Sequence, residues 1–309
     1  MGSFAEVVPA SACRADRVVL RGWIADGQLA NGGLGVAGPA LIRLGLCEAG
    51  SVATFEELVD EALRAPFSGW DFSWLAARSR SGRLPWSYRR EVVRRAAAAS
   101  AMLDMGTGGG ERLSRLSPRS PQTVATEAWP PNVPVAAARL RPLGIAVVQD
   151  EGAADNIAQE EDSRGRLPFR DGAFDLVTSR HEAFRAAEVA RVLARGGTFI
   201  TQQVDFHSYD DLYALAGLDV PPQPDSWLPL ARRQVQDAGL VVQAAARGEQ
   251  CHELGDIAAV VYYLRVVGWA IPEFSLDACA PALRAAHDAA RIWPVPVRQR
   301  CFLLVAAKP

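Results

Sequence analysis

The sequence predicts an α/β fold, a doubly wound and mostly parallel sheet with helices on both faces. Two observations support this prediction. Between residues 101 and 204, short apolar segments of strand length alternate with segments of helical periodicity. The first apolar segment leads directly into a glycine-rich turn, AMLDMGTGGGE at residues 101–111, where backbone can approach a ligand closely. On such a sheet, ligands bind beyond the carboxyl ends of the strands.

Composition and charge describe an ordinary globular protein and exclude several classes. The chain has 309 residues, 49% of them hydrophobic, and a formal net charge of -2, so net charge alone does not indicate nucleic-acid binding. No apolar run reaches membrane-spanning length, and the N-terminus lacks a signal-peptide pattern. Five scattered cysteines without a CxxC pair indicate neither a zinc site nor a disulfide framework. We therefore expect a cytoplasmic protein without a bound metal.

Residues 1–95 are expected to form a mainly helical N-terminal extension. Residues 54–64 have the periodicity of an amphipathic helix, with Thr54 as its cap and Glu57 three residues later. A formal GxGxxG at residues 33–38 lacks the preceding strand that a dinucleotide site needs, so we interpret it as a flexible or packing segment. The other expected elements are a strand at 17–24 and helices at 39–46 and 85–100.

Five strands and three helices are expected between residues 101 and 204. Each strand is a short apolar run, and turns rich in glycine, proline or charged residues separate the elements. The expected strands lie at 102–105, 123–126, 145–148, 174–178 and 198–202, and the expected helices begin near Glu111 or span 133–140 and 182–193.

Two acids indicate which ligand the glycine turn suits. Glu127 ends the second expected strand, about twenty residues after the glycines, where a carboxylate can accept from both hydroxyls of a ribose. Asp104 precedes the glycines, in the order Asp104-x-Gly106-x-Gly108-x-Gly110. An acid there would repel a pyrophosphate but suits a cationic, amine-bearing ligand. The electrostatics favour a sulfonium amino-acid nucleoside over NAD.

Four segments in this order resemble the class I S-adenosylmethionine-dependent methyltransferases, in particular a broad bacterial methyltransferase-domain group. They are LDMGTGGGE at 103–111, the acid Glu127, LPFRDGAFDLV at 167–177 and ARGGTFI at 194–200. The resemblance implies a Rossmann-like sheet of seven strands whose last strand is antiparallel. Residues 96–309 would form the methyltransferase domain, with segments 240–246 and 301–307 as its sixth and last strands.

The same resemblance implies how S-adenosylmethionine would bind. The turn residues would lie under its amino-acid and ribose portions, and Asp104 would lie near the methionine amine. Glu127 would hold the ribose hydroxyls. Asp150 could meet the adenine amine, with Glu151 and Asp155 as competing acids. The expected cofactor-binding residues are Asp104, Gly106, Thr107, Gly108, Gly110, Glu127 and Asp150.

The carboxyl end of the fourth expected strand faces the transferable methyl group in this family, and here it reads SRHE at residues 179–182. His181 could act as a general base, because a pKa near neutrality suits removing a proton from a hydroxyl or ammonium group. Glu182 could orient His181 or accept from the substrate. Alternatively, His181 caps the following helix or contacts the cofactor. Because the sulfonium is already activated, transfer depends more on in-line geometry than on a base.

Aromatic side chains from two distant parts of the sequence are candidates for the acceptor pocket. Residues 66–75 contribute Trp70 and Phe72, and a later segment contributes Tyr263 and Trp269. These side chains could line the pocket or simply anchor their segments to the core. A further polar candidate at the same rim is His207, for which a solvated loop position is the alternative.

A long helical insertion is expected between the sixth and last strands, at about residues 251–299. Its apolar helices are expected at 254–267 and 276–291. Such an insertion at the edge of the sheet could close over the substrate or form the face of a homodimer.

The sequence therefore predicts a methyltransferase that moves the methyl group of S-adenosylmethionine to oxygen, nitrogen or carbon of a small acceptor, such as a bacterial secondary metabolite. An aromatic pocket suits such an acceptor better than RNA, which calls for a basic, open surface. Arginine clusters at 78–95 and 112–119 keep an RNA or protein methyltransferase as an alternative. A second alternative is a non-methylating enzyme that uses the cofactor, such as a cyclase.

Overall fold

The computed structural model describes residues 53–153, 156, 165–289 and 293–309. The strand and helix expected at 17–24 and 39–46, and the glycine motif at 33–38, lie outside these residues. Residues Phe55–Pro309 form one compact unit. The helices between residues 55 and 96, expected in an N-terminal extension of residues 1–95, lie in the same unit as the sheet.

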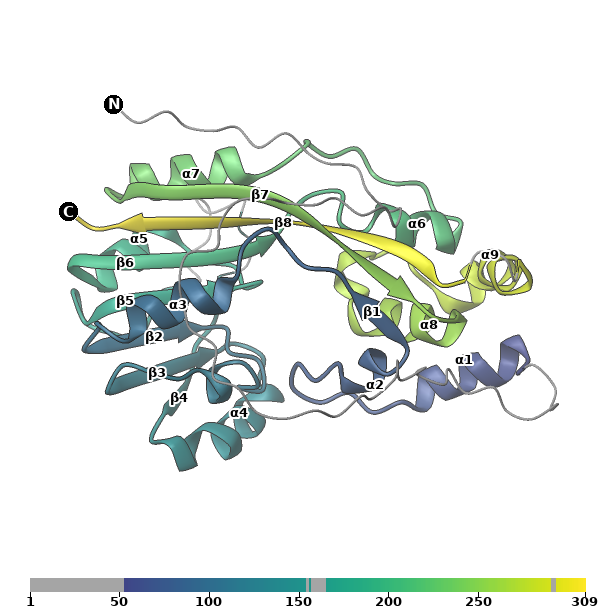
Figure 1. The fold of residues 1–309 in the computed structure, drawn as a ribbon, viewed down its shortest axis with the longest axis horizontal. Coiled ribbons are helices and arrows are strands. Elements are labelled where there is room, and N and C mark those ends of the chain that lie inside the picture. Colours follow the sequence, from purple (N-terminus) through teal and green to yellow (C-terminus); the bar gives the residue numbers. More distant parts are fainter. Residues whose placement is uncertain (1–52, 154–155, 157–164, 290–292) are drawn as a thin grey trace, which may run out of the picture. The chain divides into compact units, whose positions relative to one another are not determined.

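An eight-stranded mixed sheet organises this unit, in the order β1-β7-β8-β6-β5-β2-β3-β4 (Figure 1). Strands β2 to β6 pair in parallel, while β8 lies antiparallel between β6 and β7. The predicted fold class and the antiparallel last strand are confirmed. The strands are β1 (Ser79–Ser81), β2 (Ala101–Met105), β3 (Gln122–Glu127), β4 (Ala146–Gln149), β5 (Phe174–Arg180), β6 (Leu193–Val204), β7 (Val241–Leu254) and β8 (Val295–Ala307).

The eighth strand is a correction to the seven expected. The short β1 adds to the edge of the sheet, where Ser79 pairs with Leu254 and Ser81 with His252 in antiparallel register. Its sequence, SRS, carries no apolar alternation from which a strand could be predicted. Pairing with the long β7 decides its conformation.

The prediction of a helix that begins near Glu111 is wrong. In its place is a single 3-10 turn, η1 (Leu113–Arg115), and Leu116 is already extended. Pro118 disfavours helical backbone at the residue before it, so no more than six residues remain for a helix. A helix that short is unstable without further support. The glycine turn is therefore not followed by the N-terminus of an α-helix.

The helices cover both faces of the sheet. On one face α3 and α4 pack on Met102, Leu176 and Ile200, and on the other α5 and α7 pack on Val177 and Phe199. The α-helices are α1 (Phe55–Arg64), α2 (Ser73–Ala76), α3 (Tyr88–Ala96), α4 (Asn132–Leu140), α5 (Ala186–Val192), α6 (Asp210–Ala216), α7 (Leu228–Asp237), α8 (Ile257–Val266) and α9 (Leu276–Asp288). None of the described helices is long and apolar enough to cross a membrane.

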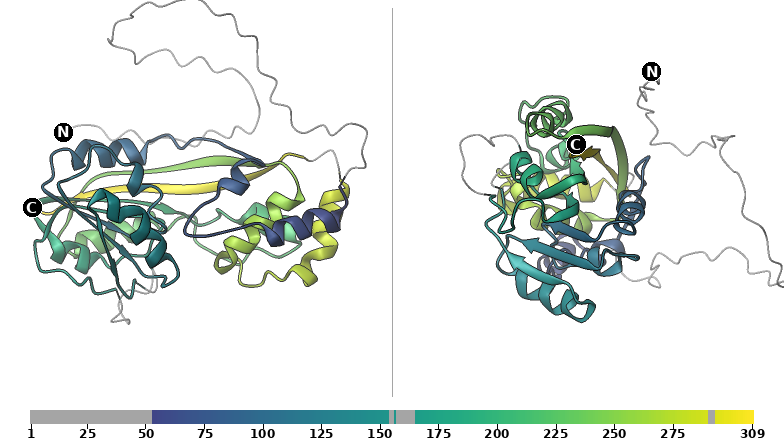
Figure 2. Two further views of the ribbon diagram at one scale, coloured as in Figure 1. Left: turned by 90° about the horizontal axis from the view of Figure 1, so that it is seen from below. Right: turned by 90° about the vertical axis from the view of Figure 1, so that its left-hand side faces the viewer.

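A separate helical core forms beside the sheet from three distant segments of the chain. The strands β7 and β8 run on past the other strands and carry α8 and α9 between them (Figure 1). Helices α1 and α2 pack against α8, and α6 packs against α9, around a buried set that includes Leu212, Tyr262 and Leu264 (Figure 2). The two helices expected in the insertion are confirmed. The insertion and residues 55–76 therefore share one core, which we call the helical core.

This core predicts the effect of truncating a side chain within it. Leu264 is fully buried on α8, whereas Leu63 on α1 is 43% exposed. We expect Leu264→Ala to lower the free energy of unfolding by about 2–5 kcal/mol, because it leaves a cavity. Leu63→Ala should lower it by less than about 1 kcal/mol, because a surface change has a small effect. Urea denaturation of both variants measures the difference, and equal losses would show that α8 is not packed as described.

Candidate functional site

The glycine turn lies at the carboxyl ends of β2 and β3. Gly106 and Gly108 have positive φ values of 58° and 63°, which side chains rarely adopt. The amide of Thr107 donates to the carbonyl of Thr126 (2.9 Å), and the amide of Gly110 donates to the carbonyl of Thr107 (3.1 Å). These bonds fix the turn against β3, so that its backbone forms the floor of the site.

The space above this turn is close to other parts of the chain. A Cβ atom at Gly106 would overlap the side chain of Glu182, and one at Gly108 would lie 3.1 Å from Cβ of Trp70. Glycine is therefore required at both positions for conformation and for space. The turn is covered from two sides, by the chain after β5 and by the aromatic segment before α2.

Glu127 connects the turn to the end of β3. Its Oε2 accepts from the amide of Gly108 (2.6 Å) and its Oε1 from the amide of Trp129 (2.9 Å). The residue is only 5% exposed, and burial raises the pKa of its carboxyl, against the lowering effect of these two bonds. The Asn132 side chain also lies close enough to lower that pKa. The carboxylate has acceptor capacity beyond the positions that the two amides use.

Asp104 lies at the end of β2, beside the neighbouring strand. Its Oδ1 accepts from the hydroxyl of Thr178 on β5 (2.8 Å), and burial raises the pKa of the carboxyl. The Thr107 hydroxyl lies close enough to lower that pKa, yet it is buried with no partner at hydrogen-bonding distance. An unpaired buried hydroxyl is costly unless a ligand satisfies it.

Glu182 lies among the acids expected to bind the cofactor. It lines a small pocket together with Gly106, Thr126, Asp150 and Gly152. Burial, followed by the negative charges of Glu127 and Asp150, raises the pKa of its carboxyl to about 8. The structure therefore places Glu182 above the glycine turn, where it is mainly protonated at neutral pH.

Asp150 follows β4, as expected for a residue at the far end of a nucleoside site. Burial raises the pKa of its carboxyl, while a bond from the Thr126 side chain lowers it. Glu127 is the last residue of β3 and pairs with Gln149 on the neighbouring β4, directly before Asp150. The two acids are thus brought to one edge of the sheet.

His181 turns the chain after β5, with a positive φ of 58°. Its Nε2 lies 3.2 Å from Nε2 of Gln202, whose Oε1 accepts from the indole of Trp86 (2.9 Å). With the amide so oriented, Gln202 donates to His181, which occupies the lone pair that a general base would use. Burial, then the charges of Arg180 and Arg112, holds the pKa of His181 well below 6.5. The imidazole is neutral and its acceptor nitrogen is already bonded.

The four predicted aromatic residues form one cluster. Trp70 stacks on Trp269 with ring centroids 5.4 Å apart, and Phe72 contacts both Trp70 (5.6 Å) and Tyr263 (6.4 Å). Phe67 joins them, 5.8 Å from Trp70. Trp269 is 62% exposed, whereas Trp70 lies against the glycine turn. The cluster therefore reaches from solvent to the floor of the site.

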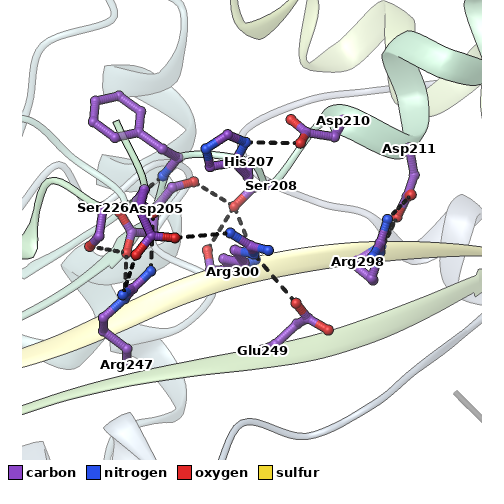
Figure 3. Close-up of polar contacts among 12 residues, drawn as sticks. Asp205, His207, Ser208, Asp210, Asp211, Ser226, Arg247, Glu249, Arg298 and Arg300 are labelled. Atoms are coloured by element: carbon purple, nitrogen blue, oxygen red, sulfur yellow. Dashed lines mark hydrogen bonds and ion pairs between the residues drawn. The ribbon is translucent and has the colours of Figure 1, made fainter. Parts of the chain in front are cut away.

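His207 lies in a different environment, a polar network at the turn between β6 and α6 (Figure 3). Its Nδ1 is 2.9 Å from Oδ2 of Asp210. In the same network, the Ser208 hydroxyl oxygen lies 2.6 Å from the carbonyl oxygen of Asp205 and 2.7 Å from that of Arg300, and its one proton can be donated to either. Among the contacts of the described residues, none joins His207 to the aromatic cluster. Its surroundings are those of a residue that shapes a turn.

Sequence reasoning missed the residues on the α3 side of the site. Arg180 ends β5 and Tyr88 begins α3, and both groups are electrostatically coupled to each other and to Asp104. Burial raises the pKa of Tyr88, so its hydroxyl is neutral. Arg112 lies nearby, after the glycine turn. The sequence signal for Arg180 is its place directly before His181 and Glu182, the expected catalytic pair. The position of Tyr88 depends on tertiary packing and has no motif.

Comparison with known proteins concerns the central part of the chain. Residues 103–201 match the family model of a methyltransferase domain, a range that begins in β2 and ends in β6. Residues 103–201 therefore belong to the methyltransferase-domain family. The predicted resemblance to the class I methyltransferases is confirmed for this part of the chain.

The relatives of this methyltransferase domain are distant. The curated protein YcgJ of Bacillus subtilis strain 168, named an uncharacterized methyltransferase, is 28% identical over 121 residues, which are 37% of this chain. The chain thus spans 44% of the length of that relative. One similar solved structure is that of a Bacillus halodurans C-125 protein provisionally named a methyltransferase. It is 17% identical, the match covers 72% of this chain and 100% of that chain, and the TM-score is 0.47. The solved structure of YcgJ is 18% identical, the match covers 71% of this chain and 97% of that chain, and the TM-score is 0.46.

The acidic pocket of the methyltransferase domain predicts how its stability depends on pH. The pKa of Glu182 is higher in the folded protein (about 8) than the usual value of 4.5, so the folded state binds an extra proton between these values. Its contribution to the free energy of unfolding is complete below about pH 4.5 and is lost as pH rises through about 8. We expect Glu182→Gln to reduce the loss of stability between pH 5 and pH 8.5, measured by urea denaturation.

A matched change tests whether this effect is specific to the pocket. Glu253→Gln alters a carboxylate on β7, away from the glycine turn. The Glu253 variant should keep the pH dependence of the unaltered protein. Equal slopes in all three proteins would contradict the placement of Glu182.

Proposed function

We propose that the protein is an S-adenosylmethionine-dependent methyltransferase that acts on a small acceptor. The observation that carries this proposal is Glu127, an acid fixed at the end of β3 by the amides of Gly108 and Trp129. This arrangement leaves acceptor capacity for two adjacent hydroxyl donors, such as those of a ribose. Membership of residues 103–201 in the methyltransferase-domain family supports the same conclusion.

The residues of the glycine turn fit this cofactor. Gly106 and Gly108 leave space that a side chain would fill, and the Thr107 hydroxyl is buried without a partner. Asp104 offers a carboxylate to an amine, and Asp150 offers one to the adenine edge. When bound, the cofactor supplies a sulfonium-activated methyl group. The Glu182 side chain lies across the space above Gly106, so it must turn away when the cofactor enters.

The protein's own part in transfer is to position the acceptor and to exclude water. Trp70 lies against the glycine turn, and Phe72 and Trp269 pack on Trp70. Together they offer an apolar surface for a planar or partly apolar molecule. Such a cover strengthens electrostatic interactions beneath it. Because the acceptor nitrogen of His181 is bonded to Gln202, we assign His181 to positioning and not to proton removal.

The arginines of the cluster at 78–95 are ion-paired only in part. Arg78 pairs with two carboxylates, and Arg94 and Arg95 both pair with Glu91. The other arginines of the cluster are exposed, so the pairs reduce the open positive surface that phosphate binding needs without removing it. The aromatic cluster is the feature that favours a small acceptor over RNA. We extend the proposal to an acceptor of bacterial secondary metabolism and to a cytoplasmic location, both on the sequence features alone.

Calorimetric titration tests the assignment of the cofactor. We expect the full chain to bind S-adenosylhomocysteine and not NAD. Glu127→Ala removes two charge-assisted hydrogen bonds of about 1.5–3 kcal/mol each. It should therefore weaken binding by about 100-fold or more. Glu253→Ala serves as the control and should bind normally.

Three results would contradict the proposal. Binding of NAD in place of S-adenosylhomocysteine would indicate a dinucleotide enzyme. Unchanged affinity in Glu127→Ala would remove the ribose assignment. Tight binding of the cofactor without methyl transfer to any acceptor would instead indicate the non-methylating alternative.

A further inference from the structure

The α3-facing side of the sheet ends in polar residues above its apolar core. Asp104 pairs in register with Thr178, and Arg180, two residues further along β5, pairs with Gln202. Because side chains alternate along a strand, Thr178 and Arg180 project to the same face as Leu176, which packs under α3. This group is distinct from the acids that lie above the glycine turn.

Arg180 is a half-buried cation without a counter-ion. Among the residues that the structure describes, none forms an ion pair or a side-chain hydrogen bond with it. Burial, followed by repulsion from Arg112, lowers its pKa to about 10. Asp104 acts on Arg180 only from beyond ion-pair distance, and its carboxyl is bonded to Thr178. By contrast, Arg191 on α5 is paired with Glu188 and Asp171.

The hydroxyl of Tyr88 is unpaired at the same place. Its oxygen is buried and has no hydrogen-bond partner within the described part of the chain, although the Thr178 side chain lies near it. Arg180 and Arg112 both act on this hydroxyl electrostatically, and α3, which begins with Tyr88, packs on β5, which ends with Arg180. Arg112 is exposed as a whole residue, but desolvation of its guanidinium lowers its pKa. The contact of Trp86 with Gln202 holds the start of α3 over the sheet here.

Unpaired donors of this kind are costly to keep. A buried donor without a partner destabilises a protein, and so does a desolvated cation without a counter-ion. Such groups are retained where a ligand completes them. A guanidinium offers two parallel N–H donors that match a carboxylate, and a tyrosine hydroxyl can add a third donor.

We propose that Arg180, with the Tyr88 hydroxyl and Arg112, binds a carboxylate at the carboxyl end of β5. A carboxylate is favoured over a phosphate dianion because the carboxyl of Asp104 lies beside the site and would repel the larger charge. The same acid would accept from an ammonium group, so the pair Asp104 and Arg180 suits an amino-acid zwitterion. The carboxylate belongs either to the amino-acid portion of the cofactor or to the acceptor, and the first source rests on the proposed function.

Three proteins test this proposal: the unaltered full chain, Arg180→Gln and Tyr88→Phe. Arg94→Gln is the matched control, since Arg94 lies exposed on α3 and pairs with Glu91. Each is titrated with S-adenosylhomocysteine and with methylthioadenosine, which lacks the amino-acid portion. Each is also titrated with benzoate and with its neutral analogue benzamide, both with and without S-adenosylhomocysteine. Urea denaturation of each variant verifies folding, and Arg180→Gln should be at least as stable as the unaltered protein.

Either of two results supports the proposal and identifies the source. If Arg180→Gln lowers the affinity for S-adenosylhomocysteine about tenfold or more but leaves the affinity for methylthioadenosine unchanged, the carboxylate is that of the cofactor. If it abolishes the preference for benzoate over benzamide in the presence of S-adenosylhomocysteine, the carboxylate is that of the acceptor. In both cases Tyr88→Phe should lower the affinity for the carboxylate ligand by a smaller factor of about 3–10, because one neutral donor is removed.

Three results would overturn it. The first is that Arg180→Gln loses affinity equally for S-adenosylhomocysteine and methylthioadenosine. The second is that Arg180→Gln changes the affinity for none of the ligands. The third is that the control Arg94→Gln shows the same losses as Arg180→Gln. If the unaltered protein binds no nucleoside, the proposed function fails. The benzoate titration without nucleoside then still decides whether a carboxylate site exists.

Discussion

The pair of hydrogen bonds that Glu127 accepts is the constraint on which the rest of the site depends. One carboxylate accepts from Gly108 in the turn and from Trp129 beyond β3, so it holds two loops at fixed distance from the strand ends. The acid is nearly buried, and its raised pKa shows that the two amides only partly offset the burial of its charge. A ligand with two hydroxyl donors would complete the compensation. Under the proposed function, the cofactor's ribose would be that ligand.

A second constraint comes from the helical core. Strands β7 and β8 extend far enough to carry α8 and α9, and α1 and α2 pack against α8. As a result, Trp70 and Trp269, 199 residues apart by their numbers, stack on each other, and Trp70 lies against Gly108. The aromatic cluster is therefore built from tertiary packing, while the glycine turn and Glu127 are held by local hydrogen bonds.

This difference explains what could be predicted from the sequence. The central strands, the glycine turn and Glu127 follow from local patterns, and the structure agrees with them. The missing helix after Glu111 could have been inferred from Pro118. The unpaired state of Arg180 and Tyr88 and the direction of the Glu182 side chain could not, since they depend on neighbours distant in sequence. His181 has a familiar residue type at an expected place, but its lone pair is used by Gln202.

The most direct measurement is a crystal structure of the full chain with S-adenosylhomocysteine. The account predicts the ribose hydroxyls within hydrogen-bonding distance of the Glu127 carboxylate, and the Glu182 side chain turned away from Gly106. A nucleoside bound elsewhere, with Glu182 still lying across the glycine turn, would contradict it.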